Sequence, residues 1–355
     1  MRITLSLKLS AILIGAFACA PAAAPPSPAT SRLTADPETR GSEVRRILST
    51  LAADSMEGRQ TGSPGAKRAA TFIAREMQNI GLSPRGDSAY FQKVPFASIA
   101  AANGRQRISL LESMQGLDTI PAPSRRISYN VIGVLPGSDA ALRDQVVVIG
   151  AHYDHLGIGT PVNGDSVYNG ADDDASGVTT VLSIARALRQ GPPPKRTILF
   201  IATTGEEQGI LGTQWYVKHP ALPVDKMVAD MEIEMIGRPD SLAGGRGKAW
   251  LTGYDRSTMG DMLRASGIPI VADPYPQFQF FERSDNIVFA RIGIPAHTLS
   301  SYNLHDDYHK PSDDIDKIDF THVTAVINAA VKAARILADG PAPQWKEGGR
   351  PAATR

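Results

Sequence analysis

The sequence predicts an α/β protein: one domain with a mixed, mostly parallel central sheet that helices cover on both faces. Short apolar runs alternate with longer segments of helical periodicity, which is the pattern of parallel strands joined by crossover helices. The run at residues 196–205 is continuously apolar, as is typical of a strand buried on both faces. Residues 40–338 contain no internal repeat and no clean linker, so one domain accounts for them.

Two helices open the domain. Apolar residues recur at helical spacing from Val44 to Leu51, behind Ser42 as the predicted N-cap. The second helix is predicted between Ser63, another N-cap, and Gly81, where glycine ends it. A polar stretch broken by prolines follows. Weak strand signals in that stretch lie at residues 91–94 and 108–111.

The rest of the domain alternates strand and helix. Runs rich in β-branched residues predict the strands, and apolar residues three or four positions apart predict the helices. The predicted strands cover residues 130–135, 145–154, 196–205, 226–237 and 294–299. The predicted helices cover residues 175–191, 206–219, 255–266, 284–292 and 320–338.

The two ends of the chain lie outside this pattern. Residues 1–19 have the layout of a secretory signal peptide, because basic residues precede an apolar run that is too short to span a bilayer. Residues 20–40, rich in Ala and Pro, are predicted to be a tether. Residues 339–355 lack apolar periodicity and are predicted to be a flexible tail, which leaves residues 41–338 as the folded domain.

The only cysteine, Cys19, leaves two processing routes open. The segment "GAFAC" resembles a bacterial lipoprotein box, in which the cysteine becomes the lipidated first residue, although Ala16 stands where such boxes usually have Leu. Ala18-Cys19-Ala20 also fits an Ala-x-Ala cleavage site. We favour lipidation. Either route predicts an extracytoplasmic protein: a periplasmic or outer-membrane-anchored lipoprotein, or otherwise a secreted protein without disulfide bonds.

The charge of the chain is balanced, with 37 Lys and Arg residues against 36 Asp and Glu residues. No basic stretch indicates a nucleic-acid surface or a polybasic membrane patch. Contact with a membrane is therefore expected only through a lipid on Cys19. The sequence does not determine the oligomeric state.

Residue types that bind metals lie at the ends of four predicted strands or just after them. They are His152, Glu206-Glu207, Glu234 and His309. In open α/β sheets, chemistry gathers at the carboxyl ends of strands. Two divalent cations about 3.5–4 Å apart need a bridging carboxylate, and imidazole and carboxylate ligands suit zinc. A further carboxylate must take a proton from the attacking water. These residue types therefore point to a two-metal hydrolase.

Five sequence blocks in the same order resemble the signature blocks of metallopeptidase family 28. They are "GAHYDHLG", "NGADDDASG", "TTGEEQGILGT", "EIEMIGR" and "DDYHKPSD". The resemblance covers residues 42–338, and five blocks in order are far more specific than any one. It implies a zinc-exopeptidase domain and an enzyme that acts on peptides. Residues 86–126 are too few for the protease-associated insert of some members.

The resemblance also implies which residues would bind two Zn²⁺ ions per chain. Asp173, the middle aspartate of the triplet, would bridge the two ions. His152 and Glu234 would complete the first site, and Glu207 and His309 would complete the second. Many relatives have Asp where this chain has Glu234, so the backbone is expected to lie farther back there.

Three further residues would take part in catalysis. Glu206 would be the general base. Asp154 would orient His152 through its second ring nitrogen. The hydroxyl of Tyr308 would steady the tetrahedral intermediate. Relatives hold the bond after the bridging aspartate in the cis form, so the Asp173–Asp174 bond is expected to be cis.

Several neighbours receive more ordinary interpretations. Asp172 and Asp174 are interpreted as residues that set the turn before the next helix. His155 and His305 are expected to line or support the site. Asn286 stands where relatives often have His, and its role is open. The residues that need partners if buried are Asp230 and Glu232.

An aromatic cluster occupies a proline-broken stretch late in the domain. Its members are Tyr275, Phe278, Phe280 and Phe281. Two interpretations are equally open: ordinary packing, or a wall of the substrate pocket that favours an apolar N-terminal side chain.

The sequence therefore predicts a dizinc aminopeptidase that acts on peptides outside the cytoplasm. A carboxypeptidase on the same scaffold would need a basic pocket, for which Arg238 and Arg283 are candidates. A glutaminyl-cyclase-like acyl transferase with one zinc is a second alternative. A binding protein without activity is a third, and the complete set of expected ligands argues against it.

Overall fold

The computed structural model describes residues 35–100 and 106–353. The predicted signal peptide, with Cys19, and most of the predicted tether lie outside the described residues. The helices are α1 Gly41–Leu51, α2 Pro64–Ile80, α3 Gly177–Gln190, α4 Leu211–Lys218, α5 Met259–Ala265, α6 Asn286–Arg291 and α7 Phe320–Asp339. The strands are β1 Ser83–Pro84, β2 Phe91–Ala100, β3 Gln106–Leu110, β4 Arg125–Leu135, β5 Val146–His152, β6 Gly157–Val162, β7 Asp165–Tyr168, β8 Thr197–Thr203, β9 Met227–Ile233, β10 Ala249–Leu251, β11 Ile270–Ala272 and β12 Ala296–Ser300.

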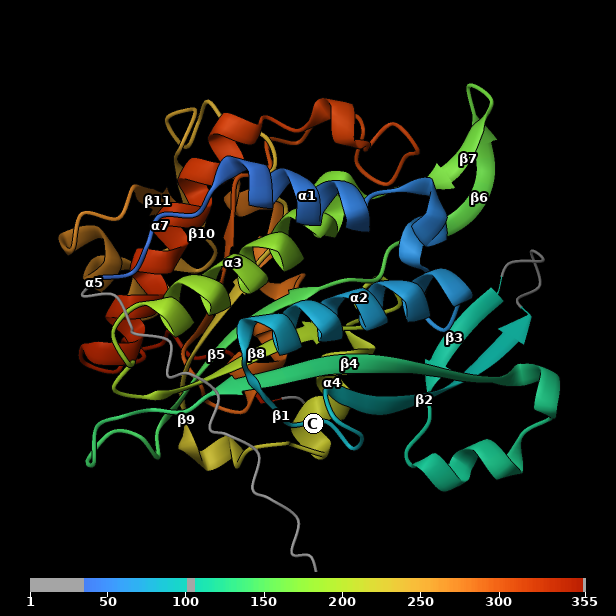
Figure 1. Cartoon of the computed structure of the whole chain (residues 1–355), viewed down its shortest axis with the longest axis horizontal. Helices are drawn as coiled ribbons and strands as arrows, with labels where there is room; N and C mark the ends of the chain where they lie inside the picture. The colour runs from blue at the N-terminus through green and yellow to red at the C-terminus, as the bar shows by residue number, and fades with distance from the viewer. Residues whose placement is uncertain (1–34, 101–105, 354–355) are drawn as a thin grey trace, which may run out of the picture. The chain divides into compact units, whose positions relative to one another are not determined.

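A ten-stranded sheet runs through the domain in the order β11-β10-β12-β9-β5-β8-β4-β2-β3, with β1 paired to β4 (Figure 1). The four middle strands, β12, β9, β5 and β8, are parallel to one another. The strands from β4 outward pair antiparallel. The predicted α/β class with a mixed central sheet is confirmed, and its parallel part lies at the centre.

The register of the middle strands brings their carboxyl ends to one edge. His152 at the end of β5 pairs with Thr203 at the end of β8. Leu299 near the end of β12 pairs with Ile233 at the end of β9. Residues that follow these four strands therefore meet at the same edge of the sheet.

Side chains of β5 alternate between two hydrophobic cores, one on each face of the sheet. Val147 and Ile149 belong to the larger core, and Val146 and Val148 belong to the smaller one. This alternation follows from the two-residue period of a strand. Burying each such side chain contributes about 1.5–3 kcal/mol, so both faces hold the sheet in place.

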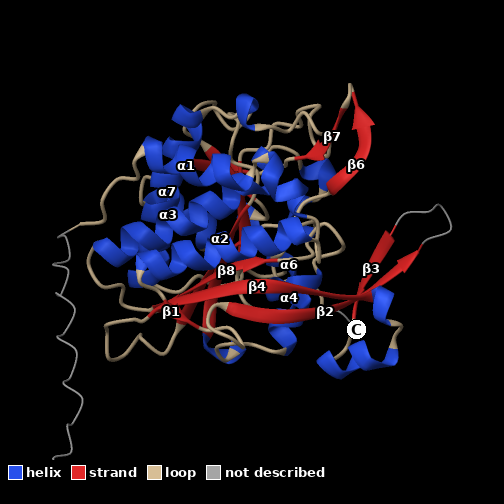
Figure 2. Cartoon of the chain, turned by 45° about the vertical axis from the view of Figure 1, so that its right-hand side comes forward, coloured by secondary structure: helices blue, strands red, loops and turns tan. Residues whose placement is uncertain are grey.

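Helices cover both faces, as the sequence predicts (Figures 1 and 2). The layer of α1, α2, α3 and α7 packs on one face, where α3 contacts β5, β8 and β9. On the other face α4 packs against β4, and α6 packs against β9 and β12. Within residues 35–100 and 106–353, no helix has the length and apolarity needed to cross a membrane.

The helix ends agree with the sequence in one case and differ in another. Ser63 accepts a hydrogen bond from the Ala66 amide and caps α2, and Gly81 ends that helix in the left-handed conformation. The prediction of Ser42 as the cap of the first helix is wrong. The helix begins at Gly41, and its N-cap residue, Arg40, makes no capping bond through its side chain.

Helix α4 starts five residues later than predicted. Gly205, Gly209 and Ile210 all have positive φ, at 78°, 108° and 62°. A helix cannot pass through left-handed residues, so the chain between them forms a turn. Glu206 and Glu207 lie in this turn at the end of β8.

Five short strands, namely β1, β6, β7, β10 and β11, were not predicted from the sequence. The hairpin β6–β7 lies between β5 and the triple-aspartate segment, and it forms a separate two-stranded sheet. The edge strands β10 and β11 have only three residues each. Such elements are too short for a periodicity to emerge.

The prediction of a flexible tail does not agree with the contacts that the tail makes. The backbone amide of Gln344 donates a hydrogen bond to the Thr258 hydroxyl at 2.9 Å. The indole of Trp345 donates to the carbonyl of Gly293 at 2.9 Å. The amide of Lys346 also donates to the carbonyl of Arg256, so several contacts dock a segment that has no periodicity of its own.

Candidate metal centre

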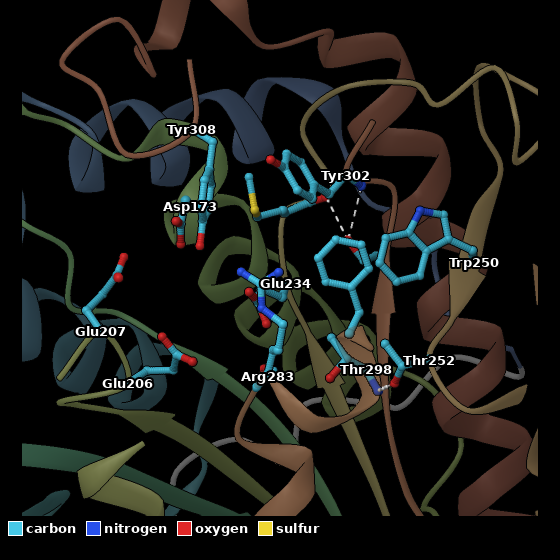
Figure 3. Close-up of a pocket in the computed structure, with 14 residues that line it drawn as sticks. Asp173, Glu206, Glu207, Glu234, Trp250, Thr252, Arg283, Thr298, Tyr302 and Tyr308 are labelled. Carbon is cyan, nitrogen blue, oxygen red and sulfur yellow. Dashed lines mark hydrogen bonds between the residues drawn. The ribbon is translucent and has the colours of Figure 1, made fainter. Parts of the chain in front are cut away.

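The predicted site residues gather at the carboxyl edge of the four parallel strands. His152 ends β5, Glu206 and Glu207 follow β8, and Glu234 follows β9. His309 lies in the loop after β12, where its φ is 57°. A pocket at this edge is lined by fourteen residues (Figure 3). They are Asp173, Glu206, Glu207, Glu234, Met235, Trp250, Thr252, Phe280, Arg283, Ser284, Thr298, Ser300, Tyr302 and Tyr308.

Asp173 lies between two histidines. Its Oδ1 is 3.3 Å from Nε2 of His152, and its Oδ2 is 3.3 Å from Nε2 of His309. Asp173 is buried, and contacts with His155, His152 and His309 overcome the effect of burial and hold its pKa well below the usual value. The bond between Asp173 and Asp174 is cis, which confirms the expectation.

The outer aspartates of the triplet accept hydrogen bonds from backbone amides. Asp174 accepts hydrogen bonds from the amides of Gly177 and Met235 at 2.9 and 3.1 Å. Asp172 accepts one from the amide of Gly237 at 2.6 Å. These bonds agree with the interpretation of both residues as turn residues and tie the triplet to the end of β9.

Glu207 contacts two histidines. Its Oε1 is 2.7 Å from Nδ1 of His155, and its Oε2 is 3.1 Å from Nε2 of His309. Burial lowers the pKa of His309, but the nearby carboxylates of Asp173 and Glu207 outweigh this and raise it to about 10. His155, Asp173 and Glu207 offer ligand atoms that lie within 4.8 Å of one another. The sequence had placed His155 beside the site; the structure places it against Glu207.

Glu206 faces His152 from the same turn, with its Oε2 4.0 Å from the ring Nε2. Burial raises the pKa of Glu206 well above its usual value, and the neighbouring Glu234 and Glu207 raise it further against the effect of His152. Burial also raises the pKa of Glu234 to about 7. These carboxylates repel one another and are most easily ionised beside a cation.

Glu234 lines the pocket but does not contact a histidine. Among the described residues, no histidine nitrogen lies within 4.0 Å of its carboxylate. Ser284 lines the same pocket and lowers the pKa of Glu234 against the effect of burial. The role of Glu234 as a ligand stays a prediction that rests on its position after β9 (Figure 3).

Asp154 lies against Nδ1 of His152, the second ring nitrogen that the sequence assigned to it, and the contact is made by its backbone. The backbone carbonyl of Asp154 lies 3.1 Å from Nδ1 of His152, and its Oδ1 is 3.9 Å away. The carboxylate accepts bonds from the Thr61 hydroxyl and the Glu206 amide, at 2.8 and 3.1 Å. Asp154 therefore fixes the ring through its backbone and fixes the Glu206 turn through its side chain.

Tyr308 stacks on His309, with ring centroids 3.8 Å apart and planes inclined by 21°. Its side chain enters the pocket beside Asp173 (Figure 3). Burial and the surrounding carboxylates raise the pKa of its hydroxyl far above the usual value. The phenol therefore stays protonated and can donate a hydrogen bond.

The sequence did not single out Arg59, whose side chain joins the backbone segments that carry the site. Its guanidinium is fully buried and donates to the carbonyls of Leu51, Tyr153, Asn169 and Gly170 at 2.6–2.9 Å. It thereby joins the end of β5 to the start of the triple-aspartate segment. The segment "DSMEGRQTGSPGAKRAATFI" is also similar to a segment of the family, but this similarity names no partner for Arg59.

A second cluster of charged residues contacts the triplet, and we call it the support cluster. It consists of Asp172, Arg238, His305, Asp307 and Asp313. Arg238 contacts Asp307, Asp313 and Asp172 at 2.6, 3.2 and 3.9 Å. The Asp313 carboxylate accepts the amides of Asp172 and Asp173, and His305 lies 3.1 Å from Asp172. Arg238 is thus committed to these acids and does not serve as the basic pocket considered from the sequence.

The "SDN" segment has a structural role. Asp285 accepts bonds from the hydroxyls of Thr203 and Thr213, on β8 and α4. Asn286 donates to the carbonyl of Phe281 and accepts from the Thr298 hydroxyl. Asp230 and Glu232 are buried near Asp285, where burial raises the pKa of each well above its usual value.

The aromatic cluster divides between the two interpretations. Phe280 lines the pocket and stacks on Trp250, with centroids 5.5 Å apart. Phe281 is buried in the smaller core, and Tyr275 packs edge-on against Trp250. Phe278 is 41% exposed. The pocket wall therefore consists of Phe280, Trp250 and Tyr302, two of which lie outside the stretch that the sequence indicated.

Ring and carboxylate atoms at the centre of the site lack hydrogen-bond partners. Among the described residues, Nε2 of His152, Nε2 of His309 and Oδ1 of Asp173 are buried without one. Buried polar atoms are normally satisfied. Nitrogen and oxygen atoms left free around one point are what a zinc site requires. We call Asp173, Glu206, Glu207, Glu234, His152 and His309 the site cluster.

Comparisons with known proteins agree with this geometry. The model of peptidase family M28 matches residues 130–334. The chain is 28% identical over 242 residues to a probable leucine aminopeptidase 2 of Aspergillus oryzae. That match covers 65% of this chain and 46% of the fungal protein, so the chain spans less than half the length of this curated relative.

Solved structures share the fold at low sequence identity. An aminopeptidase from Aneurinibacillus sp. strain AM-1 is 17% identical, with a TM-score of 0.59 over 90% of this chain and 98% of the other. The glutaminyl cyclase of Porphyromonas gingivalis is 16% identical, with a TM-score of 0.58 over 83% and 97%. At these identities the likeness shows the fold alone, because one fold hosts many activities.

Proposed function

The chain belongs to peptidase family M28, and from that premise we propose that it is an aminopeptidase that uses two zinc ions to remove N-terminal residues from peptides. One observation carries the proposal: Asp173 lies between His152 and His309, at 3.3 Å from a ring nitrogen of each. A carboxylate between two imidazoles can bridge a pair of metal ions. Names among its relatives, which include zinc metalloproteases and a leucine aminopeptidase, support zinc.

The residues present fit this cofactor. His152, Asp173 and Glu234 would hold one ion, and Asp173, Glu207 and His309 the other. The unpartnered atoms at the centre of the site would gain a partner when zinc binds. When bound, zinc polarises the scissile carbonyl and supplies an activated water.

Glu206 is the general base of the proposed reaction. Its carboxylate lines the pocket and is assigned to neither ion, so it is available to accept a proton from the attacking water. It then delivers that proton to the leaving amine. The ionised form that a base requires is favoured when the pocket holds divalent cations. Removing such a base typically costs about 10²–10⁴-fold in rate.

Tyr308 is a second catalytic group in the proposed reaction. Because its hydroxyl stays protonated, it can donate to the oxygen on which negative charge develops. The names of relatives, among them a probable leucine aminopeptidase, support action at the N-terminus rather than the C-terminus.

A set of dipeptides with free amino groups, compared with the same peptides acetylated, tests the proposal. We expect hydrolysis of the free peptides and a loss of at least about 100-fold on acetylation, because acetylation removes the hydrogen bonds that a free terminal amine can make in the pocket. Hydrolysis that is indifferent to acetylation but lost when the carboxyl end is amidated would instead show a carboxypeptidase. Cyclisation of N-terminal glutamine by a protein that holds one zinc would show a glutaminyl-cyclase-like activity.

We also propose that the enzyme acts outside the cytoplasm, anchored through a lipid on Cys19. The layout of residues 1–19 supports this proposal. Fractionation of cells that express the wild type or Cys19→Ser tests it. We expect the wild type in the membrane fraction and the variant in a soluble extracytoplasmic fraction. The same distribution for both proteins would contradict lipidation.

A further inference from the structure

The pocket beside the site cluster contains one positively charged side chain among its fourteen lining residues. Four of these residues are acids: Asp173, Glu206, Glu207 and Glu234. The single cation is Arg283, in the short link between Phe280–Glu282 and helix α6. Figure 3 shows its side chain extending into the pocket beside Glu234.

Arg283 has no acidic partner in the described part of the chain. No carboxylate there lies within 4.0 Å of its guanidinium. The guanidinium carbon of Arg283 lies 5.1 Å from the centre of the Phe280 ring. This contact places the arginine side chain against the aromatic wall of the pocket. Arg238, by contrast, contacts three carboxylates of the support cluster. Of these two arginines, only Arg283 keeps its donors available to a ligand.

The net charge of the pocket with two zinc ions bound indicates what kind of ligand an unpaired arginine would attract. Four carboxylates balance two divalent cations, so Arg283 leaves the pocket with one positive charge. A guanidinium presents paired donors in one plane, and this geometry matches the two oxygens of a carboxylate. A peptide offers a carboxylate at only two kinds of position: an acidic side chain or its C-terminus.

We propose that Arg283 binds a carboxylate of the peptide substrate and so sets the specificity of the pocket. This inference rests on the proposed peptidase function, and it deepens that function by naming the substrate class. If the carboxylate belongs to the N-terminal side chain, the enzyme prefers N-terminal Glu or Asp. If it is the terminal carboxylate, the enzyme prefers dipeptides or other very short peptides.

Two matched pairs of substrates separate these sources. Glutamyl and glutaminyl p-nitroanilides differ only in the side-chain carboxylate, and leucyl-glycine and leucyl-glycinamide differ only in the terminal one. We would measure kcat and KM for the zinc-loaded wild type, Arg283→Met and Arg291→Met. Arg291 ends α6, pairs with Glu282 at 3.9 Å and lies outside the lining of the pocket, so its variant is the control.

We expect the wild type to prefer the carboxylate member of one pair by at least about tenfold, the effect of one charge-assisted hydrogen bond. Arg283→Met should abolish that preference, mainly through KM, and change the amide member by less than about threefold. Arg291→Met should keep the preference. A wild type without preference in either pair, or a preference that survives Arg283→Met, would overturn the inference. An equal loss on all four substrates would show a structural role and would also overturn it.

A binding measurement keeps this inference separate from the proposed function. Calorimetry would compare glutamate with glutamine, and leucine with leucinamide, on the same zinc-loaded proteins. If the wild type hydrolyses none of the substrates but binds one carboxylate ligand at least about tenfold tighter through Arg283, the peptidase proposal fails and the carboxylate site stands. Equal binding within both pairs overturns the carboxylate site whether or not peptides are cleaved.

Discussion

The site cluster and the support cluster both contain His and buried Asp, but among the described residues only the acids of the support cluster pair with an arginine. In the support cluster, Arg238 contacts three aspartates, and backbone amides fill the remaining positions on Asp172 and Asp313. In the site cluster, buried atoms of His152, His309 and Asp173 have no hydrogen-bond partner within the described residues. The two clusters meet along the triple-aspartate segment.

The difference shows how one stretch of three aspartates serves two purposes. Acids that arginine and amides already neutralise need nothing more, so they set the shape of the loop. An acid whose neighbours are unpartnered ring nitrogens needs a cation that the chain does not supply. We therefore expect changes in the site cluster to alter metal binding and chemistry, and changes in the support cluster to alter stability.

The largest expected effect is that of Glu206→Gln in the site cluster. Turnover should fall by about 10³-fold, because the general base is lost, while both zinc ions stay bound. The free energy of unfolding should stay equal or rise, because the change removes a buried charge that burial disfavours. Rate assays, metal analysis and urea unfolding on one preparation check all three. The matched control is Glu282→Gln, an exposed acid outside the pocket.

Retained turnover in Glu206→Gln would remove the residue from the mechanism. Loss of stability in that variant would break the distinction between the two clusters.

The next effect is that of Arg238→Met in the support cluster. The free energy of unfolding should fall by about 3–5 kcal/mol, because Asp172 and Asp313 stay buried without their cation. Urea unfolding measures the change. Arg246→Met is the control: Arg246 pairs with Asp319 at 2.6 Å, but its side chain is 63% exposed, so its loss should cost at most about 1 kcal/mol. Equal costs for the two variants would contradict the role of the support cluster.

A smaller effect, which depends on pH, is expected at His322 beside the support cluster. Its Nδ1 accepts the Gly247 amide, and its Nε2 lies 2.9 Å from the Ser301 hydroxyl, which donates to the Arg238 carbonyl. Burial lowers the pKa of His322 from 6.5 to about 4. The folded state therefore favours the neutral ring. Stability is fully present above pH 6.5 and is lost as the pH falls toward 4, by up to about 3 kcal/mol.

Comparison of the wild type with His322→Gln isolates this histidine from the acids that titrate nearby. The variant should be less stable at pH 7, and the gap between the two proteins should shrink as the pH falls to 4.5. A gap that stays constant with pH would contradict the account of His322.

The sequence was sufficient for features that local pattern and motif spacing determine. The strands that carry the site, the turn roles of Asp172 and Asp174 and the cis bond after Asp173 all agree with the structure. The roles assigned to the five ligands stay predictions, although the structure brings four of them into contact and places Glu234 in the same pocket.

Features that depend on contacts across the fold could not be predicted. Arg59 donates to carbonyls more than a hundred residues away, and no periodicity marks such a residue. The same holds for Trp345, which docks the tail onto Gly293. The neighbour of Asp154 could be named but not the atom that makes the contact, because a sequence motif does not distinguish a carboxylate from a carbonyl.

Zinc stoichiometry tests the central claim most directly. The wild type and Asp173→Asn would be dialysed against the same buffered free zinc and analysed for metal per chain, after circular dichroism shows that both are folded. We predict two zinc ions in the wild type and fewer than one in Asp173→Asn, because a neutral amide cannot bridge two cations. One or no zinc ion in the wild type, or two in both proteins, would contradict the claim that Asp173 joins a pair of metal ions.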